Sequence, residues 1–261
     1  MPRQAILSDI HANLVALERA LKDCAEQRVD ELVCLGDMAG YGPEPIECVD
    51  LVRDQFKWTL CGNHDVALFM VHPLGFNRHA REAVAWQRTQ LEPRWFTSLA
   101  GRRRWSWLQN LHPARQDDQV LYVHASPRDP LTEYVEESDV ADLGFGPSQK
   151  IVEIFEHIPG LAFCGHSHRP GVIPASLVWI RPAELPDGIY QLAMGEKTLV
   201  NVGSVGQPRD QDPRLCYVIY DTGKRTVQFR RVDYDVPAAQ ARFQRVPQLP
   251  ERVWARLTEG V

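Results

Sequence analysis

The 261-residue chain is predicted to be an α/β protein, on three observations. It opens with an apolar run, a helical pattern and a second apolar run, which together describe a β-α-β unit. Further apolar runs of strand length follow, and several of them end in histidine, aspartate or asparagine. From about residue 176 onward the runs become short and partly alternating. A hydrophobic content of 44% is ample for the buried core that such a fold requires.

Residues 4–37 carry the β-α-β unit. The runs AILSDIH and ELVCLGD flank a segment whose apolar residues recur at helical spacing, namely Leu14, Leu17, Leu21 and Cys24. Such a unit places its two strands parallel, through a right-handed crossover. Ligands of open sheets of this kind bind at the carboxyl ends of the strands, so the residues after each apolar run are the candidates for a functional site.

The rest of the chain differs in character on either side of its middle. At about residues 66–115, REAVAWQRTQLEP and RWFTSLAGRRRWSWLQNL predict a helical segment inserted in the main domain or packed beside it. From about residue 176, the runs SLVWI, IYQLA, KTLVNVG, CYVIYD and TVQFRRV predict an antiparallel second sheet. Because no repeat or clear linker divides the chain, we expect a single domain over residues 1–261.

Composition excludes several classes of partner. The net charge of −5 gives no general attraction to a nucleic acid duplex or an anionic membrane. No apolar run approaches the roughly 20 residues of a membrane span, and the apolar stretch within the start MPRQAILSDIH is too short for a secretory signal. We therefore expect a cytoplasmic protein without a membrane partner. The six scattered cysteines predict buried free thiols rather than a disulfide framework.

Five apparent strands deliver metal-ligand or acid–base side chains at the same relative point, directly after the apolar run. These side chains are Asp9, His11, Asp37, Asn63, His64, Asp65, His124, His166 and His168. Polar loop residues without a shared function would not be expected at the same position after each of the five strands. The last of these stretches, LAFCGHSHRPG, is by itself compatible with a zinc knuckle that includes Cys164. However, Cys34, Cys61 and Cys164 each occupy the apolar run before a motif, so we expect Cys164 to be a packing residue.

Seven of these side chains suit metal ligation: Asp9, His11, Asp37, Asn63, His124, His166 and His168. Seven ligands are too many for one ion but suit two divalent ions, with Asp37 as the bridging carboxylate. Mixed oxygen and imidazole ligation favours Mn, Fe, Ni or Zn over Mg or Ca. Two such ions against two aspartates leave a positive excess that attracts phosphate, and a metal-bound hydroxide can attack phosphorus in line.

The leaving alkoxide needs a proton or a positive partner. His64 lies between Asn63 and Asp65, which makes it the candidate acid. Asp65 is the candidate to orient and charge its imidazole. These two residues complete the predicted catalytic machinery.

These motifs, in this order, resemble the calcineurin-like metallophosphoesterase superfamily: Asp9-x-His11, Gly36-Asp37, Gly62-Asn63-His64-Asp65, His124 and Gly165-His166-x-His168. The resemblance implies the metallophosphatase fold, a four-layer α/β/β/α sandwich of two mixed β-sheets flanked by helices. It implies one metal held by Asp9, His11, Asp37 and His168. It implies a second metal held by Asp37, Asn63, His124 and His166. His64 would then be the acid or the transition-state stabiliser.

Longer strings narrow the resemblance to a bacterial and archaeal branch of phosphoesterases: SDIHANLVALE, GDMAGYGPEP, VHASPRDP and NVGSVGQPRDQDPR. That branch includes phosphodiesterases and enzymes that cleave dinucleoside polyphosphates. Its late motif usually reads N-P-G-S, whereas here Val202 replaces the proline. GDMAGYG also lacks the Asp-Arg-Gly that follows this motif in phosphoprotein phosphatases, which argues against a protein-phosphatase role.

Four further residues are candidate substrate contacts. Asn13 could bind phosphate, but helix capping explains it equally well. Arg128 and Arg209 suit bidentate phosphate contact, although neighbouring aspartates offer each an ordinary loop salt bridge. Tyr41 could stack on a nucleobase, whereas a tyrosine packed on a surface turn is the commoner role.

The expected function is a phosphoesterase that hydrolyses a small-molecule or nucleotide phosphate ester, with a phosphodiester or dinucleoside polyphosphate favoured over a monoester. One alternative is a non-catalytic scaffold on the same fold, against which the complete ligand set and His64 argue. The others are a phosphomonoesterase or protein phosphatase, and a nuclease. The acidic chain shows no extended basic groove for a nucleic acid duplex.

Overall fold

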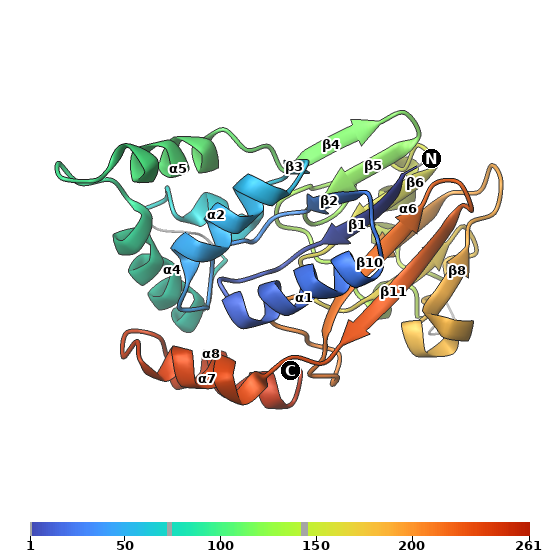
Figure 1. The fold of residues 1–261 in the computed structure, drawn as a ribbon. Coiled ribbons are helices and arrows are strands. Elements are labelled where there is room, and N and C mark those ends of the chain that lie inside the picture. Colours follow the sequence, from blue (N-terminus) through green and yellow to red (C-terminus); the bar gives the residue numbers. More distant parts are fainter. Residues whose placement is uncertain (1, 72–74, 142–145) are drawn as a thin grey trace.

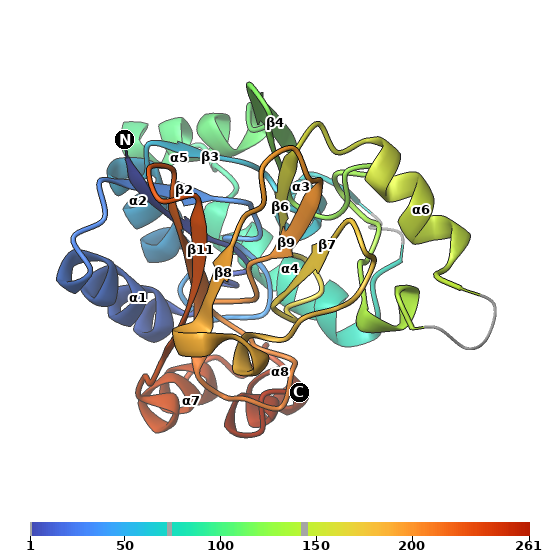
Figure 2. The ribbon, with the colours of Figure 1, turned by 90° about the vertical axis from the view of Figure 1, so that its right-hand side faces the viewer.

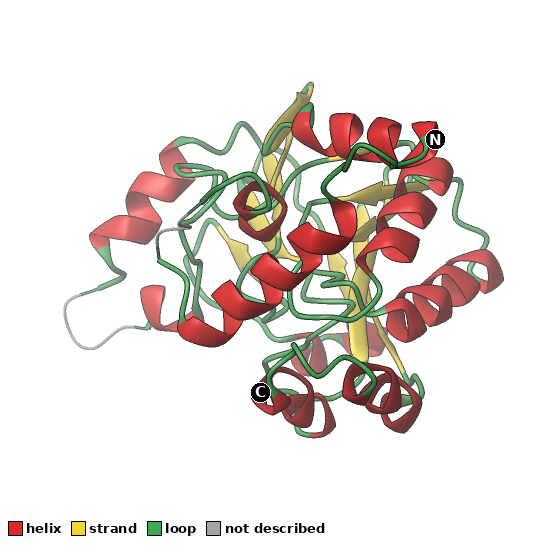
Figure 3. Ribbon diagram, turned by 90° about the vertical axis from the view of Figure 1, so that its left-hand side faces the viewer, coloured by secondary structure: helices red, strands yellow, loops and turns green. Residues whose placement is uncertain are grey.

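Two mixed β-sheets pack face to face with helices on their outer sides (Figures 1 and 3) in the computed structural model, which describes residues 2–71, 75–141 and 146–261. The six-stranded sheet of this described part runs in the order β3 (Trp58–Thr59), β2 (Glu31–Cys34), β1 (Arg3–Leu7), β10 (Leu215–Asp221), β11 (Thr226–Val232) and β8 (Ile189–Gln191). The five-stranded sheet runs in the order β4 (Ala114–Asp117), β5 (Val120–Val123), β6 (Leu161–Cys164), β9 (Thr198–Asn201) and β7 (Gly171–Pro174).

The N-terminal β-α-β unit forms as the sequence predicts. Strands β1, β2 and β3 are parallel, and α1 (Leu14–Glu26) and α2 (Pro45–Gln55) connect them in turn. Helix α1 begins at its cap Asn13, whose Oδ1 accepts a hydrogen bond from Ala16 N. Its apolar stripe packs on the outer face of the sheet together with that of α2.

The C-terminal strands do not form the separate antiparallel sheet that the sequence suggests. Instead, β10 pairs antiparallel with the free edge of β1, and β11 and β8 extend the same sheet. Strand β9 joins the other sheet, parallel to β6. SLVWI contributes only an isolated bridge between Ile180 and Val172. The reason is that β10 is apolar on both faces and needs a covered position: Tyr217 packs under α1, while Val218 faces the other sheet.

Helices cover the outer sides of the two sheets (Figure 2), and three layers of apolar side chains lie between the four layers of this sandwich. The middle layer joins the two sheets and includes Ile6, Val33, Phe163 and Val218. A second layer lies between the six-stranded sheet and helices α1 and α2. The third lies between the five-stranded sheet and α6 (Gln149–Glu156), which buries residues such as Ile154. The predicted four-layer α/β/β/α fold is therefore confirmed.

The remaining helices close the ends of the sandwich. The range 66–115 contains the end of α3 (Asn63–Ala67), α4 (Arg78–Leu91), α5 (Leu99–Gln109) and the start of β4, while residues 72–74 lie outside the described residues. Near the C-terminus, α7 (Val236–Gln244) and α8 (Glu251–Ala255) pack beside α1 and α4. Short 3-10 turns cover Glu137–Asp139, Pro182–Glu184, Pro186–Gly188 and Arg256–Thr258.

Two of the composition-based expectations concern features that the structure shows directly. None of the helices in the described part of the chain combines the length and the hydrophobicity that crossing a bilayer requires. All six cysteines belong to the described residues, and each is a buried free thiol. Cys164 lies in the apolar layer under α6, as expected of a packing residue.

Candidate metal centre

The side chains predicted as ligands meet where the strands of both sheets end. The loops after β1 and β2, the first turn of α3 and the loops after β5 and β6 supply them, in the order Asp9, His11, Asp37, Asn63, His124, His166 and His168. Backbone hydrogen bonds join the first two loops, from Asp9 N to Gly36 O at 3.1 Å and from His11 N to Asp37 O at 2.9 Å. All of the seven except Asn63 are at most 5% exposed, so their charges and lone pairs face one another rather than water.

One group of ligands comprises Asp9, His11 and His168, whose ligand atoms all lie within 4.8 Å of one another. His168 Nε2 is 3.3 Å from Asp9 Oδ1 and 3.0 Å from His11 Nε2. Asp37 Oδ2 lies 3.7 Å from His11 Nε2. Such separations suit atoms that share one cation, each at roughly 2.0–2.2 Å from it.

A second group comprises Asp37, His124 and His166, again within 4.8 Å of one another, and a third, His11, Asp37 and His64, overlaps the first. His124 Nε2 is 3.5 Å from Asp37 Oδ2 and 3.1 Å from Asn63 Oδ1. Asp37 Oδ2 thus faces His11 on one side and His124 on the other. The division of ligands that the family resemblance implies is compatible with this geometry, because Asp37 lies between the two groups.

Backbone carbonyl oxygens orient the imidazole rings. Three rings point Nδ1 at a carbonyl oxygen: His11 at Ala39 (3.0 Å), His124 at Leu35 (3.1 Å) and His168 at Gln207 (2.5 Å). Because a carbonyl oxygen only accepts, each Nδ1 carries the hydrogen and each Nε2 presents a lone pair to the site. His166 is turned the other way, since its Nε2 faces Thr132 O at 3.1 Å and Nδ1 is left as its ligand atom.

Several polar atoms at the site lack a partner among the described residues. His11 Nε2 and His168 Nε2 face each other at 3.0 Å as two lone pairs, and Asp9 Oδ1 is buried without a hydrogen bond to any described residue. Protonation does not relieve the contact, because burial lowers the pKa of His11 well below its usual value and that of His168 to about 4. A divalent cation between these atoms would satisfy all three, so the residues present fit a metal site.

The ligands occupy an unusual backbone conformation. Asp9, His11, Asp37, His166 and His168 have φ between +48° and +64°, where side-chain-bearing residues are rare. Such strain persists only when the surrounding structure enforces it, and it gathers at functional sites. Here the loop-to-loop hydrogen bonds enforce it, and they turn the ligand side chains toward a common centre.

Burial and mutual repulsion govern the charges of the carboxylates. Burial raises the pKa of Asp37 well above its usual value, and the nearby charges of Asp65 and Asp9 raise it further. Burial also favours the neutral form of Asp9, but interactions with His168 outweigh it and lower the pKa of Asp9. The metal-free site therefore carries repulsion that bound cations would relieve.

His64 is buried in the site and makes no side-chain hydrogen bond through Nδ1 to any described residue. Its ring lies 4.9 Å from that of His11 and 4.5 Å from that of Phe76, measured between centroids. A Cβ on Gly40 would lie 2.4 Å from Nδ1, so only glycine leaves room for this ring. Burial, and next the charge of Arg209, lower the pKa of His64 well below its usual value, which keeps the imidazole neutral in the metal-free protein.

Asp65 does not orient the imidazole of His64, contrary to the expectation from sequence. Its carboxylate accepts hydrogen bonds from the backbone N–H groups of Gly62 (3.0 Å), Ala39 (2.9 Å) and Met38 (3.4 Å). Burial raises the pKa of Asp65 to about 6 against the effect of these donors. Asp65 is thus a positioning residue that ties the loop after β2 to the start of α3.

The two candidate arginines have opposite surroundings. Arg128 forms ion pairs with Glu133 and Glu153 rather than with the neighbouring Asp129 that the sequence suggested, so carboxylates occupy its donors. Arg209 forms no ion pair with any described residue, because the neighbouring Asp210 is paired with Arg231. Its Nη2 donates to Gln207 Oε1 at 3.0 Å, and its buried Nε has no partner in the described part of the chain. Arg209 is therefore the arginine that is free to bind an anion.

The other two candidate contacts serve the structure. Asn13 caps α1 through Oδ1, and its Nδ2 donates to Gly206 O at 2.9 Å, so both ends of the amide are engaged. Tyr41 is 7% exposed, and its ring packs against His11 at 4.7 Å and against His64 at 4.6 Å. A buried ring between two histidines offers no face to a nucleobase, so Tyr41 is a packing residue, but a buried one rather than the surface-turn residue that the sequence suggested.

Sequence reasoning missed the residues that brace the ligand loops. At the end of β9, Asn201 Nδ2 donates to Gly165 O at 2.8 Å, and in the loop that follows, Ser204 Oγ donates to Asp9 O at 2.8 Å. On α4, the buried Gln87 accepts from Gly40 N and donates to Gly42 O, both at 2.6 Å, which holds the turn that carries Tyr41. The NVGS string marked the first loop, but no local pattern marks Gln87.

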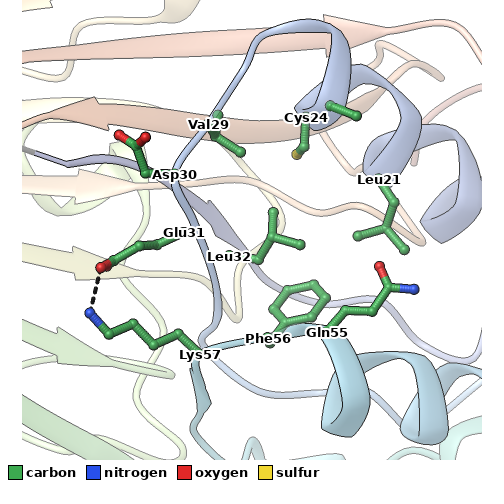
Figure 4. A pocket seen from close by; sticks show the side chains of 10 residues that line it. Leu21, Cys24, Val29, Asp30, Glu31, Leu32, Gln55, Phe56 and Lys57 are labelled. Carbon is green, nitrogen blue, oxygen red and sulfur yellow. Dashed lines mark hydrogen bonds and ion pairs between the residues drawn. The ribbon is translucent and has the colours of Figure 1, made fainter.

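A separate cavity of about 570 Å³ lies at the start of β2, opposite the end that leads to Asp37 (Figure 4). Apolar side chains of α1, β2 and Phe56 line much of it, and the ion pair between Glu31 and Lys57 borders it. It contains no imidazole and no group of ligand atoms among the residues that line it.

Comparison with known proteins decides the family. Residues 3–225 match the model of the calcineurin-like phosphoesterase superfamily domain. The chain belongs to this superfamily. A curated relative, an uncharacterized protein from Methanocaldococcus jannaschii, is 31% identical over 262 residues, which cover 98% of this chain and 97% of the relative.

Solved structures agree with the family. The crystal structure of a metallophosphoesterase from Sphaerobacter thermophilus is 35% identical, with a TM-score of 0.81 over 100% of this chain and 99% of that one. A hypothetical protein from Pyrococcus horikoshii shares the fold at 18% identity, with a TM-score of 0.74 over 100% of this chain and 99% of that one. The protein is therefore a phosphoric ester hydrolase of a metal-dependent superfamily, as the sequence motifs predicted.

Proposed function

We propose that the protein hydrolyses a small-molecule or nucleotide phosphate ester with two divalent cations, and that it favours phosphodiesters or dinucleoside polyphosphates over monoesters. The observation that carries this proposal is the position of Asp37 Oδ2, 3.7 Å from His11 Nε2 and 3.5 Å from His124 Nε2. When bound, the cations would activate a water for in-line attack on phosphorus and offset the phosphoryl charge. The mixed oxygen and imidazole donors favour Mn, Fe, Ni or Zn.

The ligands divide between the two cations as their grouping suggests. Asp37 would be shared, and the first cation would be held in addition by Asp9, His11 and His168. The second would be held in addition by Asn63, His124 and His166. The carbonyl oxygens that fix the imidazole tautomers keep the ligand nitrogens in place without further reorganisation.

His64 and Arg209 act on the substrate in this proposal. The imidazole of His64, whose Nδ1 has no partner among the described residues, donates a hydrogen bond or proton to the leaving oxygen, and the negative charge of a bound phosphate offsets the burial that lowers its pKa. The unpaired guanidinium of Arg209 binds a phosphate oxygen. Asp65 positions His64 indirectly, because its carboxylate holds the backbone on either side of the site in place.

Hydrolysis of bis(p-nitrophenyl) phosphate by the Mn²⁺-loaded protein tests the proposal, together with elemental analysis. We expect two ions per chain and turnover that falls by at least about 100-fold in His64→Ala without loss of metal. His157→Ala is the matched control, because His157 is exposed and its Nδ1 only bonds Glu153 O. The proposal fails if mono-, di- and polyphosphate esters all resist hydrolysis with each of the four metals.

We further propose that the protein acts in the cytoplasm on a small molecule, without a membrane or a nucleic acid duplex as partner. The net charge of −5 supports this, since it opposes association with polyanions. Fractionation of cells that express the protein, with a probe for bound nucleic acid, tests it. Recovery in the membrane fraction or with bound duplex would contradict it.

A further inference from the structure

Tyr134, in the loop after β5, is better placed than Tyr41 for the nucleobase stacking that the sequence suggested for Tyr41. Its ring lies on the imidazole of His166, with the centroids 4.0 Å apart and the planes tilted by 32°. It is nevertheless 43% exposed, whereas Tyr41 is 7% exposed between two histidines. Of these two tyrosines, only Tyr134 offers a ring face to a substrate.

Arg209 supplies the second half of the argument. It lies close to both tyrosines: its Nη2 is 3.4 Å from the Tyr41 hydroxyl, and a side-chain hydrogen bond links it to Tyr134, where its charge also opposes the burial that raises the tyrosine's pKa. Among the described residues, its Nε has no hydrogen-bond partner and no carboxylate pairs with its guanidinium. Arg209 is therefore available to bind an anion. An exposed aromatic ring therefore stands beside an unpaired cation at the edge of the metal centre.

We propose that Tyr134 is the stacking platform for a planar aromatic group of the substrate, so that this enzyme takes nucleotide esters in preference to alkyl esters. This inference rests on the proposed function. With the phosphate at the metal centre and against Arg209, a base one ribose away lies over the exposed ring of Tyr134, which is seated on a ligand of that same centre. Stacking of a base on an aromatic side chain adds affinity with little regard to which base it is.

Calorimetric titration of the Mn²⁺-loaded protein with inorganic phosphate, ribose 5-phosphate and adenosine 5′-monophosphate tests the inference. The ratio of the last two affinities measures the contribution of the base alone. We expect the nucleotide to bind at least about 10-fold more tightly than ribose 5-phosphate, which is within the range of one base stacked on one aromatic side chain.

Three variants locate that contribution. Tyr134→Leu keeps apolar cover on His166 but removes the aromatic face, so we expect the ratio to fall below about 2 while ribose 5-phosphate still binds. Tyr134→Phe keeps the ring, and we expect it to retain the ratio. Phe76→Leu is the matched control, because the Phe76 ring lies on the other site histidine, His64, at 4.5 Å; its ratio should stay that of the wild type.

The outcomes separate this inference from the proposed function. Equal binding of the nucleotide and ribose 5-phosphate to the wild-type protein would overturn the inference alone, provided that both bind. A ratio that survives in Tyr134→Leu, or that is lost only in Phe76→Leu, would also overturn it. If none of the three probes binds the Mn²⁺-loaded protein while it still hydrolyses bis(p-nitrophenyl) phosphate, the inference fails alone. If neither binding nor hydrolysis of any phosphate ester is seen, both proposals fail.

Discussion

Two sets of buried polar side chains in this molecule are arranged in opposite ways. Between α1, β10 and β11, Asp23 accepts hydrogen bonds from the Tyr217 hydroxyl at 2.6 Å and from the Arg230 guanidinium at 3.0 and 3.1 Å, so both carboxylate oxygens are engaged. At the strand ends, Asp9 Oδ1, His64 Nδ1 and Arg209 Nε have no partner in the described part of the chain.

The difference separates stability from function. A buried polar group normally has its hydrogen bonds filled by the protein itself, as Asp23 does, and such a triad fastens a helix to a sheet. A group of buried atoms that face one another without partners costs stability, so its persistence indicates that something else completes it. We expect substitutions in the two sets to have opposite consequences, which makes the comparison testable.

The largest expected effect comes from Asp37→Asn, which removes the carboxylate that lies between the two groups of candidate ligands, although Asp37 Oδ1 also accepts a hydrogen bond from His64 N at 2.8 Å. Loss of the shared carboxylate should lower turnover by at least about 100-fold and reduce the metal content. The metal-free variant should nevertheless melt no lower than the metal-free wild type. Burial, with the charges of Asp65 and Asp9, raises the pKa of Asp37, so its ionised form destabilises the fold at neutral pH.

Metal analysis, turnover and calorimetric melting in the presence of a chelator measure the three quantities. A large drop in the melting temperature of metal-free Asp37→Asn would contradict the comparison, because it would make Asp37 a structural residue of the same kind as Asp23.

Asp23→Asn should do the reverse. Removal of one partner from a buried ion pair costs about 3 kcal/mol of unfolding free energy, while bound metal and turnover per folded molecule should be unchanged. Burial alone would raise the pKa of Asp23, but the hydrogen bonds from Arg230 and Tyr217 hold it below its usual value. The stabilisation is therefore complete above the unfolded pKa of about 3.9, and it is lost as the pH falls through the folded value.

Urea unfolding of the wild type and of Asp23→Asn from pH 7 downward checks this pH dependence. The stability gap should remain constant down to about pH 4 and narrow only below it. A gap that closes between pH 7 and pH 5 would show that Asp23 does not carry the effect.

Substitutions of Arg209 and Arg128 should have a smaller effect on turnover, and each serves as the control for the other. We expect Arg209→Ala to lower kcat/KM for a phosphodiester by about 10- to 100-fold, since it removes a charged hydrogen bond to phosphate. Arg128→Ala should leave kcat/KM within about twofold, because Glu133 and Glu153 already occupy that guanidinium. Steady-state kinetics with Mn²⁺ decides between them, and equal losses in the two variants would remove the distinction.

Cys164→Ser should have the smallest effect. Cys164 is fully buried in the apolar layer under α6, so serine should cost about 1–2 kcal/mol of unfolding free energy for the buried hydroxyl. The metal content should stay at the wild-type value. A marked loss of bound metal would show that the thiol belongs to the unpartnered set after all.

The sequence predicts what is local. Each ligand directly follows an apolar run that ends a strand, so residues such as Asp9 and Asp37 can be assigned from their position alone. Whether an arginine forms an ion pair depends on residues far away in the sequence. SPRDP and GQPRDQDPR look alike, yet only Arg128 lies near Glu153, which belongs to α6. The edge of β1 that receives β10 is likewise a property of the assembled sheets.

The hydrogen bonds by which Asn201 and Ser204 hold the ligand loops have a consequence for protein synthesis. A nascent chain that has just completed β6 and the following turn already contains all seven candidate ligands, but not Asn201 or Ser204, whose side chains hold Gly165 and Asp9 in place. Since chains emerge from the ribosome N-terminus first, the ligands exist for some time before their geometry does. We therefore expect the protein to bind metal only late in synthesis, after the loop that follows β9 has left the ribosome. A metal-bound molecule is then one in which the two sheets have already packed together.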